Sequence, residues 1–228
     1  MSGNVNIGLP TDKFSFGSLE PVEPPETQMM DETYIVLVST GSFNPPTYMH
    51  LRMFELARDA LKLEGFHVIG GYMSPVNDAY KKRGLISAKH RIELCHHACR
   101  SSEFIMVDPW EANQNTFQRT LTVLCRIKSS LVESGQISGG EVMTTCRDFG
   151  VVCSRREGQD VDKIICNDDI LSEYKNNIKV VNEIVPNQIS STRIRDCILS
   201  GLSVKYLASD EVIDYIKQHH LYSNSMVL

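Results

Sequence analysis

Short apolar runs alternate with segments of helical periodicity along most of the chain. Residues 34–40 (YIVLVST) form a continuous run rich in β-branched side chains, which predicts a strand covered on both faces. Residues 47–63 repeat apolar side chains with the period of a helix, and Gly65 marks its end. Because strands and helices alternate in this way, the pattern predicts an α/β fold around a parallel sheet.

The same criteria predict the remaining elements. Further strands are expected at residues 67–73, 104–107, 150–154 and 178–184. Helices are expected at 87–100, around 117–131, after Ser190 and at 210–219. Since the ligand sites of parallel sheets lie at the carboxyl ends of the strands, the functional residues are expected there.

Composition narrows the class of protein. Residues 1–30 mix Pro, Glu and Ser with little to bury, which predicts a disordered tail before a single domain at 31–228. The net charge of -5 argues against a nucleic-acid or membrane-surface partner. No apolar run reaches the ~20 residues of a spanning helix. Seven cysteines without a repeating spacing indicate reduced thiols, and hence a cytoplasmic or nuclear protein.

The strongest chemical signal is the stretch STGSFNPPTYMHLRMFELA at residues 39–57. A buried strand ends at Gly41, the chain turns through two prolines, and a helix begins near Thr47. Backbone N–H groups and the positive end of the helix dipole then converge on one point, which favours a phosphate. His50 lies in the first helical turn, within reach of the same anion. Taken alone, the turn would also suit an ordinary strand–turn–helix with a surface histidine.

Two other segments end predicted strands and carry cations. PNQISSTRIRDCI at 186–198 opens a helix with hydroxyl groups, and Arg195 offers a planar fork for phosphate oxygens. SPVNDAYKKRG at 74–84 places three consecutive cations next to Tyr80. A helix cap with a solvated arginine, or a solvated basic loop, would explain each segment by itself. Their shared position at strand ends favours an anionic substrate.

Together these segments resemble the eukaryotic nicotinamide/nicotinate mononucleotide adenylyltransferases over roughly residues 34–222. The resemblance is carried by GSFNPPTYMH, SPVNDAYKK, the pair His90-Arg91, ISSTRIR and the final GLSVKYLASDEVIDYI. It implies a Rossmann-like parallel sheet with helices on both faces. It also implies adenylyl transfer from ATP, with Mg²⁺, to the mononucleotide (NMN or NaMN), giving NAD or its deamido form and pyrophosphate.

The resemblance assigns residues to three groups. The catalytic group comprises His50, Lys82 and Arg195. The ATP and phosphate group comprises Gly41, Ser42, Phe43, Thr47, His50, Thr192, Arg193, Ile194 and Arg195. The nicotinamide-nucleotide group comprises Ser42, Phe43, Tyr80, Lys82, Phe117, Thr120 and Asn187, although Asn187 also matches an adenosine contact. Phe117 stands where the family typically has a stacking Trp. No protein metal ligand is expected, because the triphosphate holds the Mg²⁺.

One departure from the family pattern bears on activity. GGEVM at 139–143 runs directly into TTCRDFG, where the family has a Gly-x-Asp strand end and a second stacking Trp. The sequence therefore predicts an internal deletion near residues 143–144, with the fold largely kept, weakened ATP binding and a larger loss of mononucleotide binding. The alternative function is that of a catalytically impaired isoform that binds nucleotide or protein. SPVNDAYKK and the element from Phe117 to Thr120 argue against a pantetheine-phosphate or flavin adenylyltransferase. Assembly into a homo-oligomer stays open.

Three other groups of residues have simpler interpretations. CHHAC at 95–99 places its cysteines on an apolar helix face, so core packing is favoured over zinc. His219 and His220 end a helix and suit its dipole. The stretch DPWE at 108–111 follows a strand near the site, and both a structural and a functional role stay open.

Overall fold

The protein is described by a computed structural model, which covers residues 7–15, 33–135, 150–155, 160–185 and 187–223. Its first sheet has the order β1-β2-β3 and is parallel throughout. The strands are β1 (Tyr34–Gly41), β2 (His67–Pro75) and β3 (Ile105–Val107). Gly41 pairs with Pro75 and Met73 with Val107, so the three strands reach their carboxyl ends at one edge.

A second, separate parallel sheet pairs β4 (Val151–Arg155) with β5 (Ile178–Asn182). The expected single sheet is thus two sheets in the described part of the chain. β1 is an outer strand of its sheet there, and most of its residues are half-buried. Leu37 packs in the apolar cluster on one face and Val36 and Val38 in the cluster on the other, so the predicted cover on both faces is confirmed although no described strand pairs with the outer edge of β1.

The predicted helices are confirmed, with ends within a few residues of expectation. They are α1 (Tyr48–Lys62), α2 (Ala88–Cys99), α3 (Thr120–Glu133), α6 (Ser191–Leu199) and α7 (Asp210–Gln218). The sequence analysis missed four short elements, which are η1 (Glu111–Asn113), α4 (Val161–Asn167), α5 (Asp169–Glu173) and η2 (Lys175–Asn177). Within the described residues, no helix is long and apolar enough to cross a bilayer.

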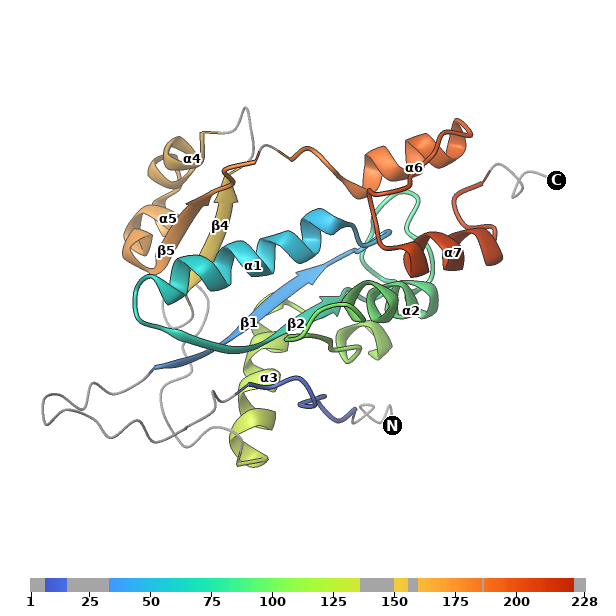
Figure 1. Cartoon of the computed structure of the whole chain (residues 1–228). Coiled ribbons are helices and arrows are strands. Elements are labelled where there is room, and N and C mark those ends of the chain that lie inside the picture. The colour runs from blue at the N-terminus through green and yellow to red at the C-terminus, as the bar shows by residue number, and fades with distance from the viewer. Residues whose placement is uncertain (1–6, 16–32, 136–149, 156–159, 186, 224–228) are drawn as a thin grey trace, which may run out of the picture.

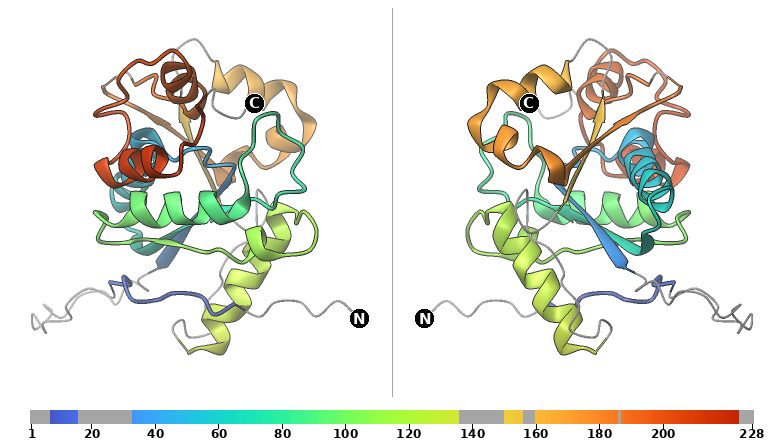
Figure 2. Two further views of the ribbon diagram at one scale, coloured as in Figure 1. Left: turned by 90° about the vertical axis from the view of Figure 1, so that its right-hand side faces the viewer. Right: turned by 90° about the vertical axis from the view of Figure 1, so that its left-hand side faces the viewer.

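Helices cover both faces of the first sheet, as predicted (Figures 1 and 2). On one face Phe54 of α1 and Cys95 of α2 pack against Met73. On the other face α3 packs Val123, Ile127 and Leu131 against Tyr72 and Met106. A third apolar cluster joins α2 to α6 and α7, which places the start of α6 beside the carboxyl edge of the sheet.

Residues 7–15 depart from the predicted disordered tail. Lys13 Nζ donates to the carbonyls of Cys99 and Ser102, each at 2.7 Å, at the end of α2. The Tyr72 hydroxyl donates to the Pro10 carbonyl at 2.6 Å, and the ring of Phe14 packs edge-on against Tyr72. The prediction is wrong for this stretch because tertiary contacts, rather than local periodicity, order it.

Candidate active site

The turn between β1 and α1 is built around a close contact of two residues. Phe43 has φ 40°, a left-handed backbone, and its ring is buried. A Cβ added to Gly41 would lie 3.2 Å from Phe43 Cζ, so a larger residue at that position would press against the buried ring and the ring would have to shift. The predicted turn from strand to helix is therefore present, and because the Phe43 ring is buried, only the backbone of this residue is available to a ligand.

His50 is fixed by the capping of α1. The Thr47 backbone N–H donates to His50 Nδ1 at 3.0 Å, and Thr47 Oγ1 lies 2.8 Å from the same nitrogen. Because Nδ1 accepts the backbone N–H, the proton of the neutral ring resides on Nε2. The ring also packs edge-on against Phe43, with centroids 5.3 Å apart. His50 is thus held as a hydrogen-bond donor at the helix start.

The start of α6 lies against the same turn. Arg195 Nη1 donates to the Asn44 carbonyl at 2.7 Å and Nη2 to Thr192 Oγ1 at 3.3 Å. Ser191 Oγ donates to the Pro45 carbonyl at 2.7 Å. Two helix starts and two of the three predicted catalytic side chains therefore converge, which is the arrangement expected for a phosphate site.

Two predicted residues of this segment are placed differently from expectation. The Ile194 side chain is fully buried in the cluster of α2, α6 and α7, so only its backbone is available to a ligand. Asn187 Oδ1 accepts the Ile189 backbone N–H at 2.8 Å and does not line the pocket described next. Its position before α6 favours the adenosine side over the nicotinamide side.

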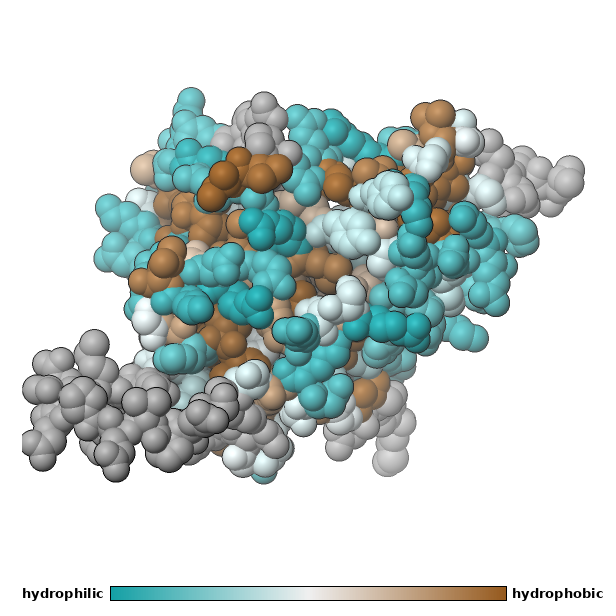
Figure 3. Space-filling view, in the orientation of Figure 1, coloured by the Kyte–Doolittle hydropathy of each residue, from teal (hydrophilic) through white to brown (hydrophobic). Residues whose placement is uncertain are grey.

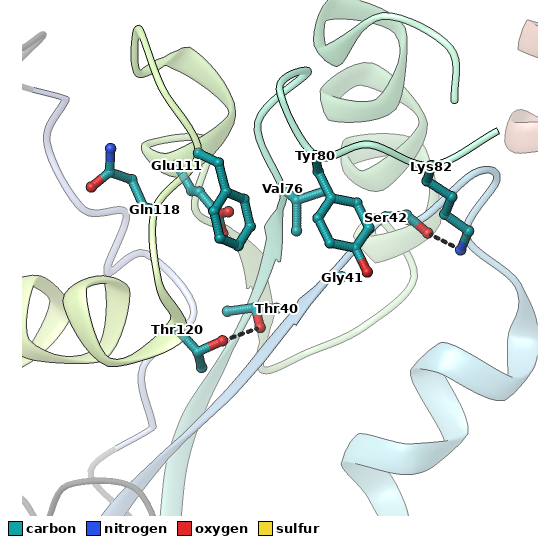
Figure 4. Close-up of a pocket in the computed structure, with 10 residues that line it drawn as sticks. Thr40, Gly41, Ser42, Val76, Tyr80, Lys82, Glu111, Gln118 and Thr120 are labelled. Atoms are coloured by element: carbon teal, nitrogen blue, oxygen red, sulfur yellow. Dashed lines mark hydrogen bonds between the residues drawn. The ribbon is translucent and has the colours of Figure 1, made fainter. Parts of the chain in front are cut away.

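A pocket of about 230 Å³ opens at the carboxyl ends of β1 and β2 (Figure 4). It is lined by Thr40, Gly41, Ser42, Val76, Tyr80, Lys82, Glu111, Phe117, Gln118 and Thr120. Most residues assigned to the nicotinamide nucleotide are thus brought together. Lys82 Nζ donates to Ser42 Oγ at 2.9 Å, which joins the loop after β2 to the phosphate turn.

Two exposed aromatic rings form one wall of the pocket. Tyr80 and Phe117 are stacked, with centroids 5.7 Å apart and ring planes 27° apart, and both remain about two-fifths exposed. Exposed stacked rings offer flat surfaces for a further aromatic ring, and a positively charged ring adds cation–π attraction. Phe117 precedes α3, whereas the sequence analysis placed it at the start of that helix.

Arg91, half of the His90-Arg91 motif, supports the site from beneath. Its guanidinium is fully buried and donates to the carbonyls of Val76 at 2.6 Å, Ile86 at 2.9 Å and Ser42 at 3.3 Å. It also pairs with Asp78 at 2.9 Å. Arg91 therefore holds the loops that carry the lining residues.

The stretch DPWE, left open by the sequence, divides into two roles. Asp108 is buried and pairs with Arg126 at 2.8 Å, a structural contact between β3 and α3. Glu111 lines the pocket. Thr40, Val76 and Gln118 were also missed, because nothing in their local pattern distinguishes them from ordinary strand-end or loop residues.

The cysteines of CHHAC belong to the core, as their apolar helix face predicted. Cys95 and Cys99 are buried between α2 and the first sheet. Burial raises the pKa of Cys95 strongly and that of Cys99 to about 12, so both are held as neutral thiols.

Proteins of known families are similar to this chain over most of its length. Residues 38–197 match the family described as Cytidylyltransferase-like. The nicotinamide/nicotinic acid mononucleotide adenylyltransferase of Arabidopsis thaliana is 52% identical over 244 residues, covering 96% of this chain and 99% of that protein. The chain belongs to this adenylyltransferase family.

A second relative supports this family, and a solved structure supports the fold. The family protein of Oryza sativa subsp. japonica is 57% identical over 215 residues, covering 83% of this chain and 86% of that protein. A structure described as a putative nicotinate-nucleotide adenylyltransferase from Vibrio parahaemolyticus aligns with a TM-score of 0.52 at 16% identity, covering 83% of this chain and 95% of that one. The latter shows that the fold is the nucleotidyltransferase fold.

Proposed function

We propose that the chain transfers the adenylyl group of ATP to nicotinamide or nicotinate mononucleotide in NAD biosynthesis. The observation that carries the proposal is the adjacency of two sites. The anion site of the β1–α1 turn, with His50 and Arg195, shares Gly41 and Ser42 with a pocket walled by stacked aromatic rings. A triphosphate and a pyridine mononucleotide placed there meet at the turn.

The reaction needs no protein nucleophile. A phosphate oxygen of the mononucleotide attacks the α-phosphorus of Mg·ATP, a new P–O bond forms, and the bond to the β-phosphate oxygen breaks as pyrophosphate leaves. The protein contributes positioning and stabilisation of negative charge. We assign His50 Nε2 and Arg195 to the ATP phosphates, and Lys82 to the phosphate of the mononucleotide. Mg²⁺ enters with ATP as part of the substrate.

Aromatic stacking supplies recognition of the second substrate. The Tyr80 and Phe117 rings suit the positively charged pyridine ring, and Thr120 lies at the same wall. Neither a pantetheine-phosphate nor a flavin substrate offers a cationic ring that would stack on the paired aromatic rings. The pyridine mononucleotides are therefore the proposed substrates.

We further propose that the chain lacks an internal segment between α3 and β4. The predicted junction near Met143 lies outside the described residues. The Arabidopsis alignment has 244 positions but uses 96% of 228 residues, so roughly 25 positions face a gap in this chain. The separation of the two sheets and the exposed apolar atoms over the second sheet (Figure 3, left) also support a missing strand. The consequence is a weakened enzyme rather than a different activity.

The cellular setting follows the same proposal. The described cysteines are free thiols, which supports a location of the protein in the cytoplasm, the nucleus or both.

Incubation of the purified chain with Mg·ATP and each mononucleotide tests the proposal. Chromatography should show NAD or its deamido form accumulating together with an equal amount of pyrophosphate. Absence of both products at high enzyme concentration, from a chain that is folded by circular dichroism, would overturn the proposed function.

A further inference from the structure

Glu111 is a carboxylic acid buried at the inner end of the pocket. It begins η1, shortly after β3, and is only 1% exposed. Figure 4 shows its carboxyl group directed toward the side of the pocket formed by Val76 and Tyr80. A charged side chain in this position is unusual, because buried carboxyl groups are normally paired.

The carboxyl group is only partly satisfied by the protein. The Asn77 backbone N–H donates to it, whereas Oε1 has no hydrogen-bond partner in the structure. Leaving a buried polar atom unpaired costs free energy, and a ligand group that pairs with it recovers that cost. Because this buried oxygen is unpaired and Glu111 belongs to the lining of the pocket, we take Glu111 as a hydrogen-bonding position for a ligand that enters the pocket.

The charges around Glu111 leave it close to its titration point at neutral pH. Burial raises the pKa of Glu111 to about 7. The Asn77 N–H and the Arg91 guanidinium of α2 act in the opposite direction, and Asp108 at the end of β3 raises the pKa further. Both protonation states are thus available under physiological conditions.

The neighbouring charges are engaged elsewhere. Arg91 is bound to Asp78 and to backbone carbonyls, and Asp108 is paired with Arg126. Across the pocket, Lys82 contacts Ser42, and the Tyr80 ring stacks on the aromatic wall. Among the described residues that line the pocket, Glu111 is therefore the one suited to form a hydrogen bond with a polar substituent of a ligand at the inner end of the pocket.

We propose that Glu111 determines which pyridine mononucleotide the pocket accepts, by pairing with the substituent on the ring. The ionised carboxylate accepts an N–H of the nicotinamide carboxamide. The protonated acid instead donates its proton to the carboxylate of the nicotinate analogue. One residue can then serve both substrates, with a preference that changes with pH. This inference rests on the proposed function and names the substrate selection at that site.

The inference requires a defined proton balance. Binding of the nicotinate form at pH 8 takes up close to one proton, which is held on Glu111 in the complex. Binding of the nicotinamide form at pH 6 releases a proton from the same group. The 5′-phosphate of the mononucleotide is common to both ligands, so its own titration cancels when their affinities are compared as a ratio.

Calorimetric titration of the full chain with NMN and NaMN at pH 6 and pH 8 tests the proposal. Buffers of different ionisation enthalpy report the protons exchanged. With a pKa near 7, the ratio of the two dissociation constants should change by up to about a hundredfold between these pH values, in favour of NaMN at pH 6.

Glu111→Gln keeps the shape of the side chain and both donates and accepts at every pH. In this variant the ratio of the dissociation constants for NMN and NaMN should no longer change with pH, and binding should exchange no proton. Glu103→Gln, at an exposed position just before β3, is the matched control and should keep the pH dependence of the unmodified chain. The proton exchange of the unmodified chain decides the matter even if Glu111→Gln fails to fold.

The outcomes separate the two proposals. Binding of both mononucleotides with a pH-independent ratio and no proton exchange overturns the role of Glu111 and leaves the proposed function standing. A ratio that still changes in Glu111→Gln as in the unmodified chain does the same. Failure of both mononucleotides to bind at any pH overturns the proposed function, and this inference with it.

Discussion

His50 combines a structural and a chemical role in one side chain. Its Nδ1 accepts the Thr47 N–H and completes the capping of α1, which leaves Nε2 with the proton that we propose is donated to phosphate. The sequence could predict the second role, because the position in the first turn is visible. The first role depends on the side-chain conformation and appears only in the structure.

Replacing His50 by alanine should lower kcat for dinucleotide formation by ~10²–10³, since a donor to the charge of the transition state is lost. Steady-state kinetics with Mg·ATP and NMN measures this. His67→Ala, at the exposed opposite end of β2, is the matched control and should change kcat less than about twofold. A His50→Ala chain that turns over within a few-fold of the parent would contradict the assignment.

The guanidinium of Arg195 contacts both the turn after β1 and the start of its own helix. It donates to the Asn44 carbonyl and to Thr192, which aligns it with the phosphate turn. Arg195→Lys should raise KM for ATP by about tenfold, because a lysine cannot keep these contacts and also present a fork to phosphate.

The control for this change is Arg100→Lys, at the exposed end of α2, which should leave KM for ATP unaltered. An unchanged KM for ATP in Arg195→Lys would show that the guanidinium does not hold the nucleotide.

Among the elements, those with strong local periodicity were predictable and the others were not. The helices α1 and α7 follow from their apolar spacing, and α2 follows from its N-cap residue Ser87. α4 and α5 were missed because they are short and largely exposed. Asp160 and Asp168, whose side chains cap these helices, are the signal that could have found them.

The segment 7–15 illustrates order that local sequence does not reveal. Lys13 donates to carbonyls at the carboxyl end of α2, where the helix dipole also favours a cation. Lys13→Ala should therefore lower the free energy of unfolding by about 1–3 kcal/mol. Denaturant titration measures this.

Lys89→Ala, on the exposed surface of α2, is the matched control and should stay within about 0.5 kcal/mol of the parent. Equal stabilities of the two variants would mean that the contacts of Lys13 with the end of α2 do not stabilise the fold.

At the scale of the whole molecule, the sequence predicted the fold class but not the division of the sheet. Strand pairing joins residues far apart in sequence, so local periodicity could not show that β4 and β5 form a sheet separate from β1, β2 and β3. The elements β1, α1 and α6, which carry the proposed anion site, are all present. The mononucleotide pocket has one aromatic wall, whereas the family pattern supplies a second stacking residue from the segment that we propose is missing.

The most direct test of this account compares the chain with a version that carries, after Met143, the corresponding segment of the Arabidopsis relative. The measurement is kcat/KM for NMN at saturating Mg·ATP, with dinucleotide formation as the readout. We predict that both chains form NAD, and that the restored segment raises kcat/KM at least about tenfold, mainly through a lower KM for NMN. Equal efficiencies of the two chains, or no NAD from either, would contradict the account.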